Sequence, residues 1–470
     1  MATASQPDPL ATFQQMRNLV HADNTLPYGE RIKLLKSLRT GLKAKQNALI
    51  KAIDQDFQGR ARQETIIADI LPTLGIIDYT IKHLRKWMKP RRRHVALHFI
   101  PAKNRILMQP KGVVLIISPW NYPISLSILP MVTAIAAGNR VILKPSEFTP
   151  KTSDLIAELV HGALPADRAT VMTGGADVSI TLCKLPFDHI LFTGSTNVGR
   201  EVMKSAAENL TPVTLELGGK SPAVIHGDYD LATAAMRIAR GKLLNAGQTC
   251  IAPDYVLLAR DKIDAFVTHY NDVITRFYPD IEDNNDYTAI INQHHFDRLK
   301  ALLQDAKAKG ATVQVVGASA TGSSGQHKLH PHVILDTSDD MQICHEEIFG
   351  PLLPIIAYDS LDQASAYINQ RARPLALYYF DNDKQRVNAF LAATTSGGAA
   401  INDTVLHFVQ DDLPFGGVGA SGMGVCHGHE GFCELSHAKP VFYQARLNST
   451  AILNPPYGAT FERIIKFLTR

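Results

Sequence analysis

Cys250 and Glu216 are the two side chains of this sequence best placed to act as a nucleophile and a base. Cys250 ends the run Asn245-Ala246-Gly247-Gln248-Thr249-Cys250, in which polar residues precede the thiol and small residues leave the sulfur open to approach. Glu216 lies between Leu215 and Leu217, and such apolar neighbours raise the pKa of a carboxyl group, which suits a general base. A lone cysteine is more often a small buried hydrophobe, so catalysis by this thiol needs further support.

A glycine-rich turn provides a candidate phosphate site. The run Thr193-Gly194-Ser195-Thr196-Asn197-Val198-Gly199 follows an apolar strand and precedes a predicted helix over Arg200–Ala207. Such a turn points backbone N–H groups and the positive end of a helix at an anion. The spacing differs from the dinucleotide fingerprint and from the P-loop, so a plain tight turn stays an alternative. Glu216 follows Gly194 by about 20 residues, as the fingerprint's ribose carboxylate would, but its apolar neighbours favour a base instead.

The C-terminal part holds a group of cysteine and histidine residues: Cys426, His427, His429, Cys433 and His437. These are metal-ligating residue types, but their spacing lacks the paired Cys-x₂₋₄-Cys pattern of zinc sites. We therefore predict no metal, and a non-catalytic metal- or ligand-binding protein stays an alternative function. Seven glycines between residues 403 and 439 indicate backbone that turns sharply or approaches another group closely.

The composition is typical of a folded protein of several domains. The chain has 470 residues, of which 45% are hydrophobic and 20% charged, and a formal net charge of +4. These values exclude intrinsic disorder and small disulfide scaffolds, and the length predicts two or three domains. The net charge is too small to favour nucleic acid as a partner, and the basic stretch from Lys82 to His94 is interpreted as a solvated or ion-paired connector.

The cysteine count and the apolar runs bear on location. Five cysteines in a chain with no evident secretory signal indicate a reducing compartment, so we expect a cytoplasmic protein with a loose tail over Met1–Leu10. The stretch Gly112–Gly138 has no charged side chain, but three prolines would break a membrane helix there. We predict a buried strand, a loop and a buried helix in this stretch, and no integral membrane segment.

The periodicity of apolar residues predicts an α/β fold. Helical spacing over residues 28–57 and 65–87 is followed by short runs, rich in Val and Ile, that alternate with helix-length segments. These runs lie at residues 112–118, 140–143, 169–172, 189–192, 212–217 and 222–225, a pattern typical of βαβ units and a parallel sheet. A second alternating set begins after Leu231, with strands predicted at 255–259 and 312–316 and an exposed loop at 317–326.

Seven motifs together resemble those of NAD(P)-dependent aldehyde dehydrogenases, in order and approximate spacing. Together they span nearly the whole chain. The seven motifs are Pro119-Trp120-Asn121-Tyr122-Pro123, Leu143-Lys144-Pro145-Ser146-Glu147, Phe192-Thr193-Gly194-Ser195, Leu215-Glu216-Leu217-Gly218-Gly219-Lys220-Ser221-Pro222, Gly247-Gln248-Thr249-Cys250, Glu346-Glu347-Ile348-Phe349-Gly350-Pro351 and Leu413-Pro414-Phe415-Gly416-Gly417. The ending Pro455-Pro456-Tyr457-Gly458 and the short length are most similar to the branch that contains coniferyl and fatty aldehyde dehydrogenases.

The resemblance implies an α/β protein in three parts. A Rossmann-like parallel-sheet domain for NAD(P) would cover residues 1–88 and 108–217, and an α/β catalytic domain with the thiol would cover 218–403. Small bridging segments at 89–107 and 404–450 would exchange strands in a homodimer, and a tail would follow at 451–470.

The resemblance also implies a mechanism. The Cys250 thiolate would attack the aldehyde to give a thiohemiacetal, whose oxyanion the Asn121 amide and the Cys250 N–H would hold. Hydride transfer would leave a thioester, and Glu216 would deprotonate the water that hydrolyses it. Release of the acyl group to coenzyme A is the alternative outcome of the same chemistry. Aromatic aldehydes such as coniferyl aldehyde and medium- or long-chain aliphatic aldehydes are both candidate substrates.

The implied cofactor is NAD, with NADP possible. By the resemblance, Lys144 and Glu147 would meet the adenosine ribose, and the Glu147 carboxylate would disfavour the 2′-phosphate of NADP. Arg200 is a possible phosphate partner. The resemblance places Gly194, Ser195 and Gly199 by the pyrophosphate, and Glu347 on the nicotinamide ribose with Phe349 beside it. Trp120 is a further candidate cofactor-binding residue.

Overall fold

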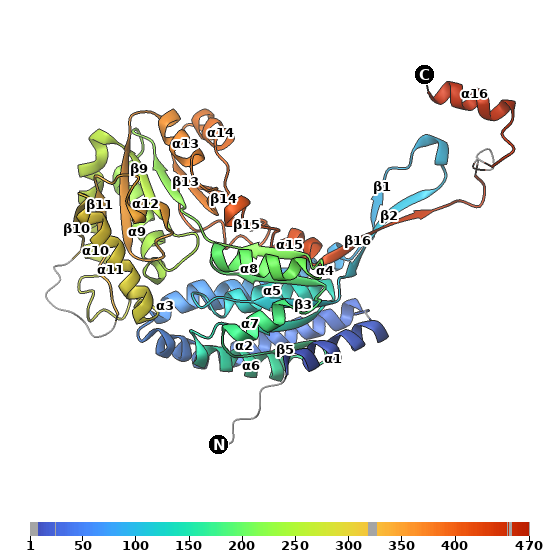
Figure 1. The fold of residues 1–470 in the computed structure, drawn as a ribbon, viewed down its shortest axis with the longest axis horizontal. Helices are drawn as coiled ribbons and strands as arrows, with labels where there is room; N and C mark the ends of the chain where they lie inside the picture. Colours follow the sequence, from blue (N-terminus) through green and yellow to red (C-terminus); the bar gives the residue numbers. More distant parts are fainter. Residues whose placement is uncertain (1–7, 24, 318–326, 449, 451–453, 470) are drawn as a thin grey trace, which may run out of the picture.

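The computed structural model describes residues 8–23, 25–317, 327–448, 450 and 454–469. Two α/β lobes lie side by side, and a narrow arm projects from them and ends at the C-terminal helix (Figure 1). We name the lobes by their sheets. The first lobe is built on the six-stranded sheet β15-β7-β6-β3-β4-β5, the second lobe on the seven-stranded sheet β10-β11-β12-β9-β8-β13-β14, and the arm on the three-stranded sheet β1-β2-β16.

The first lobe confirms the predicted parallel sheet. Its strands are β3 (Val113–Ile117), β4 (Arg140–Lys144), β5 (Ala169–Val171), β6 (His189–Thr193), β7 (Val213–Glu216) and the short antiparallel β15 (Gly422–Met423). The central strands are buried on both faces, which is why they are continuous apolar runs in the sequence. The chain order reverses between β3 and β6, and ligands of open α/β sheets bind at such a switch point.

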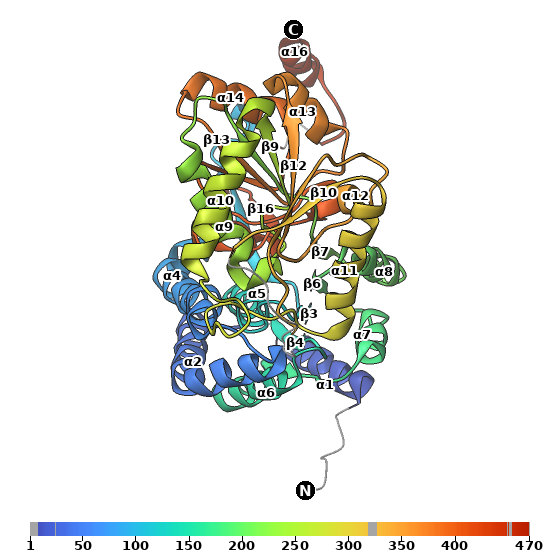
Figure 2. The ribbon, with the colours of Figure 1, turned by 90° about the vertical axis from the view of Figure 1, so that its left-hand side faces the viewer.

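Helices cover both faces of this sheet (Figure 2). Side chains of α2, α4, α5 and α6 form one apolar core with the sheet, and those of α1, α7 and α8 form another. The helical elements are α1 (Pro9–Ala22), α2 (Tyr28–Phe57), α3 (Arg62–Thr65), the π-helical turn η1 (Ile66–Ile70), α4 (Leu71–Trp87), α5 (Ser125–Ala137), α6 (Pro150–Ala163), α7 (Ala176–Cys183) and α8 (Thr196–Ala207).

Three local predictions in this lobe need correction. The loose tail predicted over Met1–Leu10 is wrong at Pro9 and Leu10, which begin α1, and residues 1–7 lie outside the described residues. The Asp8 carboxylate accepts the Ala11 N–H, and Phe13 and Met16 of this helix are buried. Contrary to the prediction, Pro130 does not interrupt a helix but lies inside α5, within its second turn. The glycine-rich turn is shorter than predicted, since Ser195 caps a helix that begins at Thr196 and not at Arg200.

The second lobe is also mostly parallel, and only β10 runs antiparallel to its neighbour. Its strands are β8 (Pro222–Ile225), β9 (Tyr255–Ala259), β10 (Thr312–Val315), β11 (His332–Leu335), β12 (Leu352–Tyr358), β13 (Ala376–Phe380) and β14 (Gly398–Ile401). Its helical elements are α9 (Leu231–Leu243), η3 (Leu244–Gly247), η4 (Arg260–Lys262), α10 (Ile263–Phe277), α11 (Gln293–Ala308), α12 (Gln342–His345), α13 (Leu361–Asn369) and α14 (Lys384–Ala393). The loop predicted at 317–326 lies, apart from Gly317, outside the described residues.

The arm joins segments far apart in the sequence. Strand β2 (Lys103–Pro110) pairs with β1 (Arg91–Arg93) on one side and β16 (Ser436–Tyr443) on the other, both antiparallel. The predicted basic connector is thus partly a strand, with Arg92 and Arg93 exposed. The remaining elements are η2 (Leu97–Phe99), η5 (Gly419–Ser421), α15 (Gly428–Glu434) and α16 (Ala459–Leu468). Among the described residues, no helix has the length and apolarity needed to cross a bilayer.

Candidate active site

A cavity of about 1050 Å³ lies between the two lobes. Residues that follow β3, β6 and β7 of the first lobe line one side, and residues that precede β9, β12 and β13 of the second lobe line the other. The wall includes eight of the predicted site residues: Trp120, Asn121, Gly194, Ser195, Glu216, Cys250, Glu347 and Phe349. Lys144, Glu147 and Gly199 are not in this wall.

The loop before Cys250 has an unusual backbone. Asn245, Ala246 and Gly247 have φ values of 54°, 50° and 78°, so three successive residues are left-handed. Such a conformation is costly for Asn and Ala and persists only where the surroundings enforce it. At Gly247 a side chain is excluded as well, because a Cβ would lie 2.3 Å from the Gly350 carbonyl oxygen. The half-buried Cys250 thiol therefore emerges from a loop that its surroundings hold in one conformation.

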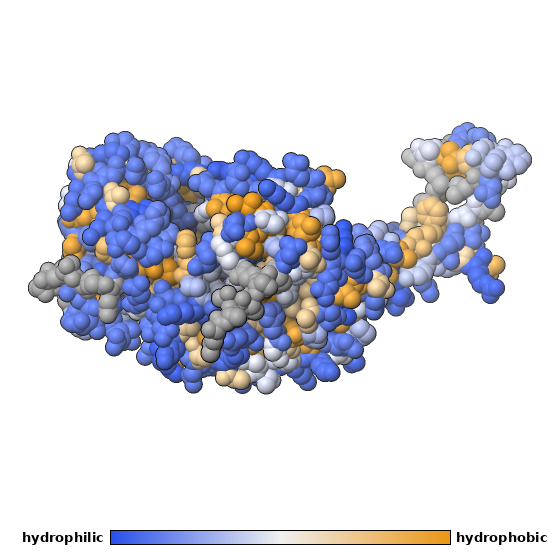
Figure 3. All heavy atoms as spheres, turned by 60° about the horizontal axis from the view of Figure 1, so that its bottom comes forward, coloured by the Kyte–Doolittle hydropathy of each residue, from blue (hydrophilic) through white to orange (hydrophobic). Residues whose placement is uncertain are grey.

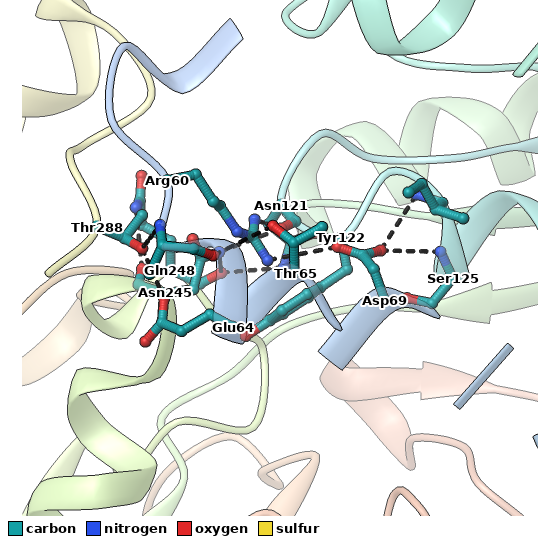
Figure 4. A network of polar contacts seen from close by, with 12 residues as sticks. Arg60, Glu64, Thr65, Asp69, Asn121, Tyr122, Ser125, Asn245, Gln248 and Thr288 are labelled. Carbon is teal, nitrogen blue, oxygen red and sulfur yellow. Dashed lines mark hydrogen bonds and ion pairs between the residues drawn. The ribbon is translucent and has the colours of Figure 1, made fainter. Parts of the chain in front are cut away.

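A buried polar network holds this loop against the first lobe (Figure 4). Glu64 of α3 accepts hydrogen bonds from the Asn245 N–H at 3.1 Å and the Thr288 hydroxyl at 2.6 Å. Gln248 donates to the Asn245 and Ala289 carbonyl oxygens and accepts the Ile291 N–H. The loop thus depends on partners from both lobes.

The same network fixes Asn121. Arg60 donates to the Asn121 carbonyl oxygen at 2.6 Å and forms a fully buried ion pair with Asp69 at 3.4 Å. Asp69 in turn accepts the N–H groups of Ile124 and Ser125, three and four residues after Asn121 in the chain. The Asn121 amide lies against the thiol loop, since its Nδ2 donates to the Gln248 carbonyl oxygen at 3.1 Å. These contacts set the position of the amide relative to Cys250.

The sequence analysis did not identify Arg60, Glu64 or Asp69 as site residues. The sequence held one signal for Asp69, which is its position on the helical stretch. At intervals of four residues, Asp69 shares a buried face with Thr65, Thr73 and Ile77. A charged residue on a buried face needs a charged or hydrogen-bonding partner. The pattern shows that a partner exists, but it does not say that Arg60 provides it.

Glu216 has the environment predicted for a base. It ends β7, its carbonyl oxygen accepts the Gly194 N–H at 3.0 Å, and its side chain is buried. Among the described residues, neither carboxyl oxygen has a hydrogen-bond partner of standard geometry. Burial raises the pKa of Glu216 well above its ordinary value, and the neighbouring Cys426 thiol lowers it by a smaller amount. The group is therefore a far better proton acceptor than an exposed glutamate.

Cys250 is a weak acid in this structure. Burial of the thiol and the nearby Glu347 and Glu216 carboxyl groups raise the pKa of Cys250 to about 12. The N–H groups of Cys250 and Ile251 oppose this rise. The thiolate is thus scarce at neutral pH, and a base is needed to form it.

Glu347 faces the same cavity from the second lobe. Its pKa is raised to about 8, mainly by burial and also by Asp254, whereas a hydrogen bond from the Gly219 backbone lowers it. Arg298 holds the backbone here by donating to the Glu347 and Ile348 carbonyl oxygens. One Glu347 oxygen, Oε1, is buried without a partner among the described residues, so the carboxyl group is free to receive a hydroxyl from a ligand.

The turn that the sequence predicts to bind phosphate is shaped by close packing. Gly194 has no room for a side chain, because a Cβ would lie 2.5 Å from the Phe192 ring. Ser195 is the N-cap of α8, so the backbone N–H groups of the first turn point into the cavity edge, a ready anion site. Gly199 lies inside that first turn and lets Leu217 pack, since a Cβ would lie 2.6 Å from Leu217 Cδ2.

Lys144 is the last residue of β4 and Glu147 follows shortly after it, and β3 separates β4 from β6, the strand that leads into this turn. Their side chains form an ion pair with a distance of 2.6 Å between Nζ and Oε2. The Lys144 side chain is buried and the Glu147 side chain is exposed. The size of the larger cavity, the anion site at the start of α8 and the unpartnered carboxyl oxygen of Glu347 are compatible with an extended dinucleotide. Such a ligand would run from this end of the sheet to Cys250.

A second, smaller cavity opens on the other side of Cys250. Cys250 and Glu216 belong to its wall as well, and the rest is largely apolar: Leu126, Leu129, Pro130, Leu191, Leu217, Leu375, Phe408 and Phe415, with Thr193, Cys426 and His427. The thiol and the carboxyl group therefore stand where the two cavities meet.

The C-terminal cysteines and histidines are divided between two places. Cys426 and His427 line the apolar cavity, whereas Cys433 lies 2.7 Å from Arg91 and 3.5 Å from His429 at the base of the arm. In the described part of the chain, no three His, Cys, Asp or Glu side chains are arranged to hold a metal ion.

Comparison with known proteins bears on this arrangement. Residues 1–441 match the aldehyde dehydrogenase family. A "Probable coniferyl aldehyde dehydrogenase" of Pseudomonas aeruginosa is 52% identical over 455 residues, 97% of this chain and 95% of the relative. The "Coniferyl aldehyde dehydrogenase" of a Pseudomonas strain is 44% identical over 426 residues, 90% and 88% of the two chains. A solved structure described as "Substrate bound state of Staphylococcus Aureus AldH" has a TM-score of 0.93 and 38% identity, and covers 98% of this chain and 100% of that chain.

Proposed function

Because this chain belongs to the aldehyde dehydrogenase family, we propose that Cys250, Glu216 and Asn121 perform the family's reaction where the two cavities meet. The activity is the oxidation of an aldehyde to the carboxylic acid with NAD(P)⁺. One observation supports the residue assignment above all others. Cys250 and Glu216 both border a cofactor-sized cavity on one side and an apolar pocket on the other.

In the first step, the Cys250 sulfur attacks the aldehyde carbon that enters from the apolar cavity. Glu216 accepts the thiol proton, which the raised pKa of its carboxyl group favours. The carbonyl oxygen becomes an oxyanion, and the Asn121 Nδ2 and the Cys250 N–H donate to it. The rigid network around both residues keeps these donors in place before the reaction begins.

In the second step, NAD(P)⁺ would supply the acceptor for the hydride that leaves the thiohemiacetal carbon on Cys250. The product on the enzyme is a thioester of Cys250. Glu216 first releases the thiol proton to solvent, so that it is ionised again. It then takes a proton from water, the resulting hydroxide attacks the thioester carbon, and the Cys250 thiolate leaves. A buried base beside the thioester favours hydrolysis over transfer to coenzyme A, because a thiol acceptor needs no activated water.

We propose NAD as the preferred cofactor, bound mainly by the first lobe and, at its nicotinamide end, also by the second. Lys144 and Glu147 would contact the adenosine ribose, Gly194, Ser195 and Gly199 would shape the pyrophosphate site, and Trp120, Glu347 and Phe349 would surround the nicotinamide ribose. The predicted division into residues 1–88 and 108–217 for the cofactor and 218–403 for the thiol agrees with the division of the walls between the lobes. The exposed Glu147 carboxylate would repel the 2′-phosphate of NADP.

We propose an aromatic aldehyde of the coniferyl type as substrate. Two relatives are named for coniferyl aldehyde, and Phe408, Phe415 and leucines line the apolar cavity beside Cys250. This cavity has a volume of about 30 Å³, so it must widen to admit a ring. Burial of the ring against these side chains then predicts a kcat/KM for coniferyl aldehyde at least about a hundredfold above that for acetaldehyde. Initial rates for aromatic and aliphatic aldehydes, each with NAD and with NADP, test this. A preference for long aliphatic aldehydes over all aromatic ones would replace the substrate class and leave the reaction intact.

The role of Asn121 predicts a specific loss. Asn121→Ala should lower kcat by about 10²- to 10³-fold, because one donor to the oxyanion is removed. Asn121→Asp keeps the shape of the side chain and also lacks the donor, so it should lose a similar factor. Steady-state rates at saturating aldehyde and cofactor give the comparison. A kcat for either variant within twofold of the parent would exclude the amide from the oxyanion site.

We also propose a homodimer formed through the arm, and a cytoplasmic location. The arm projects from the body with apolar residues on its surface (Figure 3). These include Leu97, Ile100 and Phe442, with exposed fractions of 83%, 57% and 51%. Such residues on an extended sheet favour pairing with a second copy. A solution mass twice the 51.6 kDa of the chain, measured by light scattering, is expected. The five free cysteines support a reducing compartment.

A further inference from the structure

Cys426 places a second thiol in the apolar cavity, opposite Cys250. It is half-buried, and its backbone is fixed by a reciprocal pair of hydrogen bonds with Phe415, at 3.0 and 2.7 Å. Four residues earlier, Gly422 of β15 pairs with Glu216 of β7. The sheet of the first lobe therefore carries the Cys426 segment directly past the end of β7, and the position of the thiol is set by backbone pairing rather than by a mobile loop.

The carboxyl group beside this thiol lacks what a buried carboxylate needs. The Glu216 side chain is more than nine-tenths buried, and among the described residues neither oxygen has a standard hydrogen-bond partner. An ionised carboxylate in such a place is unstable unless a donor turns toward it. Cys426 is the neighbour close enough to affect its charge, and the S–H group is a weak donor.

We propose that Cys426 is a further positioning residue for hydrolysis of the thioester: its S–H group donates to the Glu216 carboxylate and orients this base toward the water that attacks the Cys250 thioester. This inference rests on the proposed roles of Cys250 and Glu216. No covalent change occurs at Cys426, and its proton remains on sulfur throughout. The S–H of Cys426 stabilises the charged form of the base, while the other oxygen of the carboxylate stays free for water.

The charges around Glu216 favour this role. The thiols of Cys250 and Cys426 face it, and His427 lines the same cavity. Burial lowers the pKa of His427 to about 4, so this imidazole is neutral at pH 7 and supplies no positive charge. Burial and the adjacent Glu216 raise the pKa of Cys426 well above its ordinary value, so it stays a protonated donor. The pKa of Glu347, on the cofactor side, is raised to about 8, so this carboxyl group is mostly neutral at pH 7 and supplies no positive charge to Glu216.

The sign of the pH effect follows from these contacts. Cys426 lowers the pKa of Glu216 against the effect of burial. Its removal therefore raises that pKa, and the hydrolytic rate, which requires ionised Glu216, rises only at higher pH. A serine hydroxyl is a stronger donor than a thiol, so Cys426→Ser should retain or lower the pKa.

The test is the pH profile of kcat between pH 6 and 10 for the parent, Cys426→Ala and Cys426→Ser, at saturating aldehyde and NAD. We expect Cys426→Ala to move the rising limb of the kcat profile to higher pH by about half a pH unit or more. At a given pH on this limb, kcat should then be about threefold lower than in the parent. The first-turnover burst of NADH should keep its amplitude, because thioester formation comes earlier. Cys183→Ala is the matched control, since this buried thiol lies at the end of α7 and lines neither cavity, and its limb should match the parent's.

Two outcomes would overturn the proposal. One is a limb for Cys426→Ala that coincides with the parent's, and the other is an equal shift for alanine and serine, which would mean that Cys426 only fills space. Failure of the underlying assignment has a different signature. If Glu216→Gln keeps the parent's limb, then Glu216 is not the titrating base, whatever the Cys426 variants do.

Discussion

Replacement of Cys250 by serine is expected to lower aldehyde-dependent NADH formation by at least about 10⁴-fold. A hydroxyl is a much weaker acid and nucleophile than a thiol, and an ester intermediate would be hydrolysed less readily than a thioester. The cavity accepts the change, because serine is smaller than cysteine. Absorbance at 340 nm with saturating aldehyde and NAD measures the loss. Cys183→Ser serves as the control and should keep the parent rate, and oxidation by Cys250→Ser at the parent rate would refute the mechanism.

The acidity of Cys250 gives an independent measurement. Because the pKa of Cys250 is raised to about 12 in the cofactor-free protein, the reactive thiolate fraction should increase about tenfold per pH unit between pH 7 and 10. The rate of iodoacetamide labelling of Cys250, followed by mass spectrometry, should show this slope. A plateau near pH 8 would mean that the thiol is already ionised and needs no base.

Replacement of Glu216 by glutamine is expected to stop the reaction after its first half. Glutamine keeps the size of the side chain but cannot accept a proton from water, so kcat should fall by about 10² to 10⁴. One equivalent of NADH per active site should still appear, but more slowly than in the parent, because Glu216 also takes the thiol proton. The acyl group should then remain on Cys250 as a mass increase. The parent's kcat should rise with pH as Glu216 ionises, whereas the residual rate of the variant should lack this limb. Sustained turnover at the parent rate would remove Glu216 from the mechanism.

The stability of the Glu216→Gln variant separates chemistry from misfolding. The folded protein binds the Glu216 proton more tightly than the unfolded chain does, because burial raises the pKa of this carboxyl group. The folded state then has more bound protons, so its stability falls as pH rises above the unfolded pKa of about 4.3. Glutamine has no charge to bury. The variant should therefore melt at the same or a higher temperature than the parent at pH 8, and a lower one would point to disturbed packing.

The elements of the fold were largely predictable because each follows a local rule. The runs that became β3, β4 and β6 are continuous and apolar, as strands buried on both faces must be, and α2 has its predicted bounds. The family motifs led to the residues around the larger cavity. The start of α8 was harder to predict from the sequence. It depends on Ser195 accepting the Val198 N–H, and the same residues could also form several other turns.

Other parts of the site depend on contacts between distant segments. Nothing near Cys426 in the sequence indicates that its thiol lies by Glu216, because β15 brings them together across about 200 residues by pairing with β7. The same holds for Arg60 and Asn121, which are 61 positions apart and meet through one hydrogen bond. Residue type and spacing suggest which groups could react, and only tertiary pairing decides which of them share a cavity.

The left-handed loop of residues 245–247 has a consequence for the order in which this enzyme matures. Its hydrogen bonds to Glu64 and Asn121 come from the other lobe, so neither lobe can form the reactive loop by itself. The appearance of activity during refolding therefore marks docking of the lobes rather than completion of either sheet. An isolated second lobe would lack the partners that hold its reactive loop. Only a chain whose two lobes have docked therefore holds this loop in place.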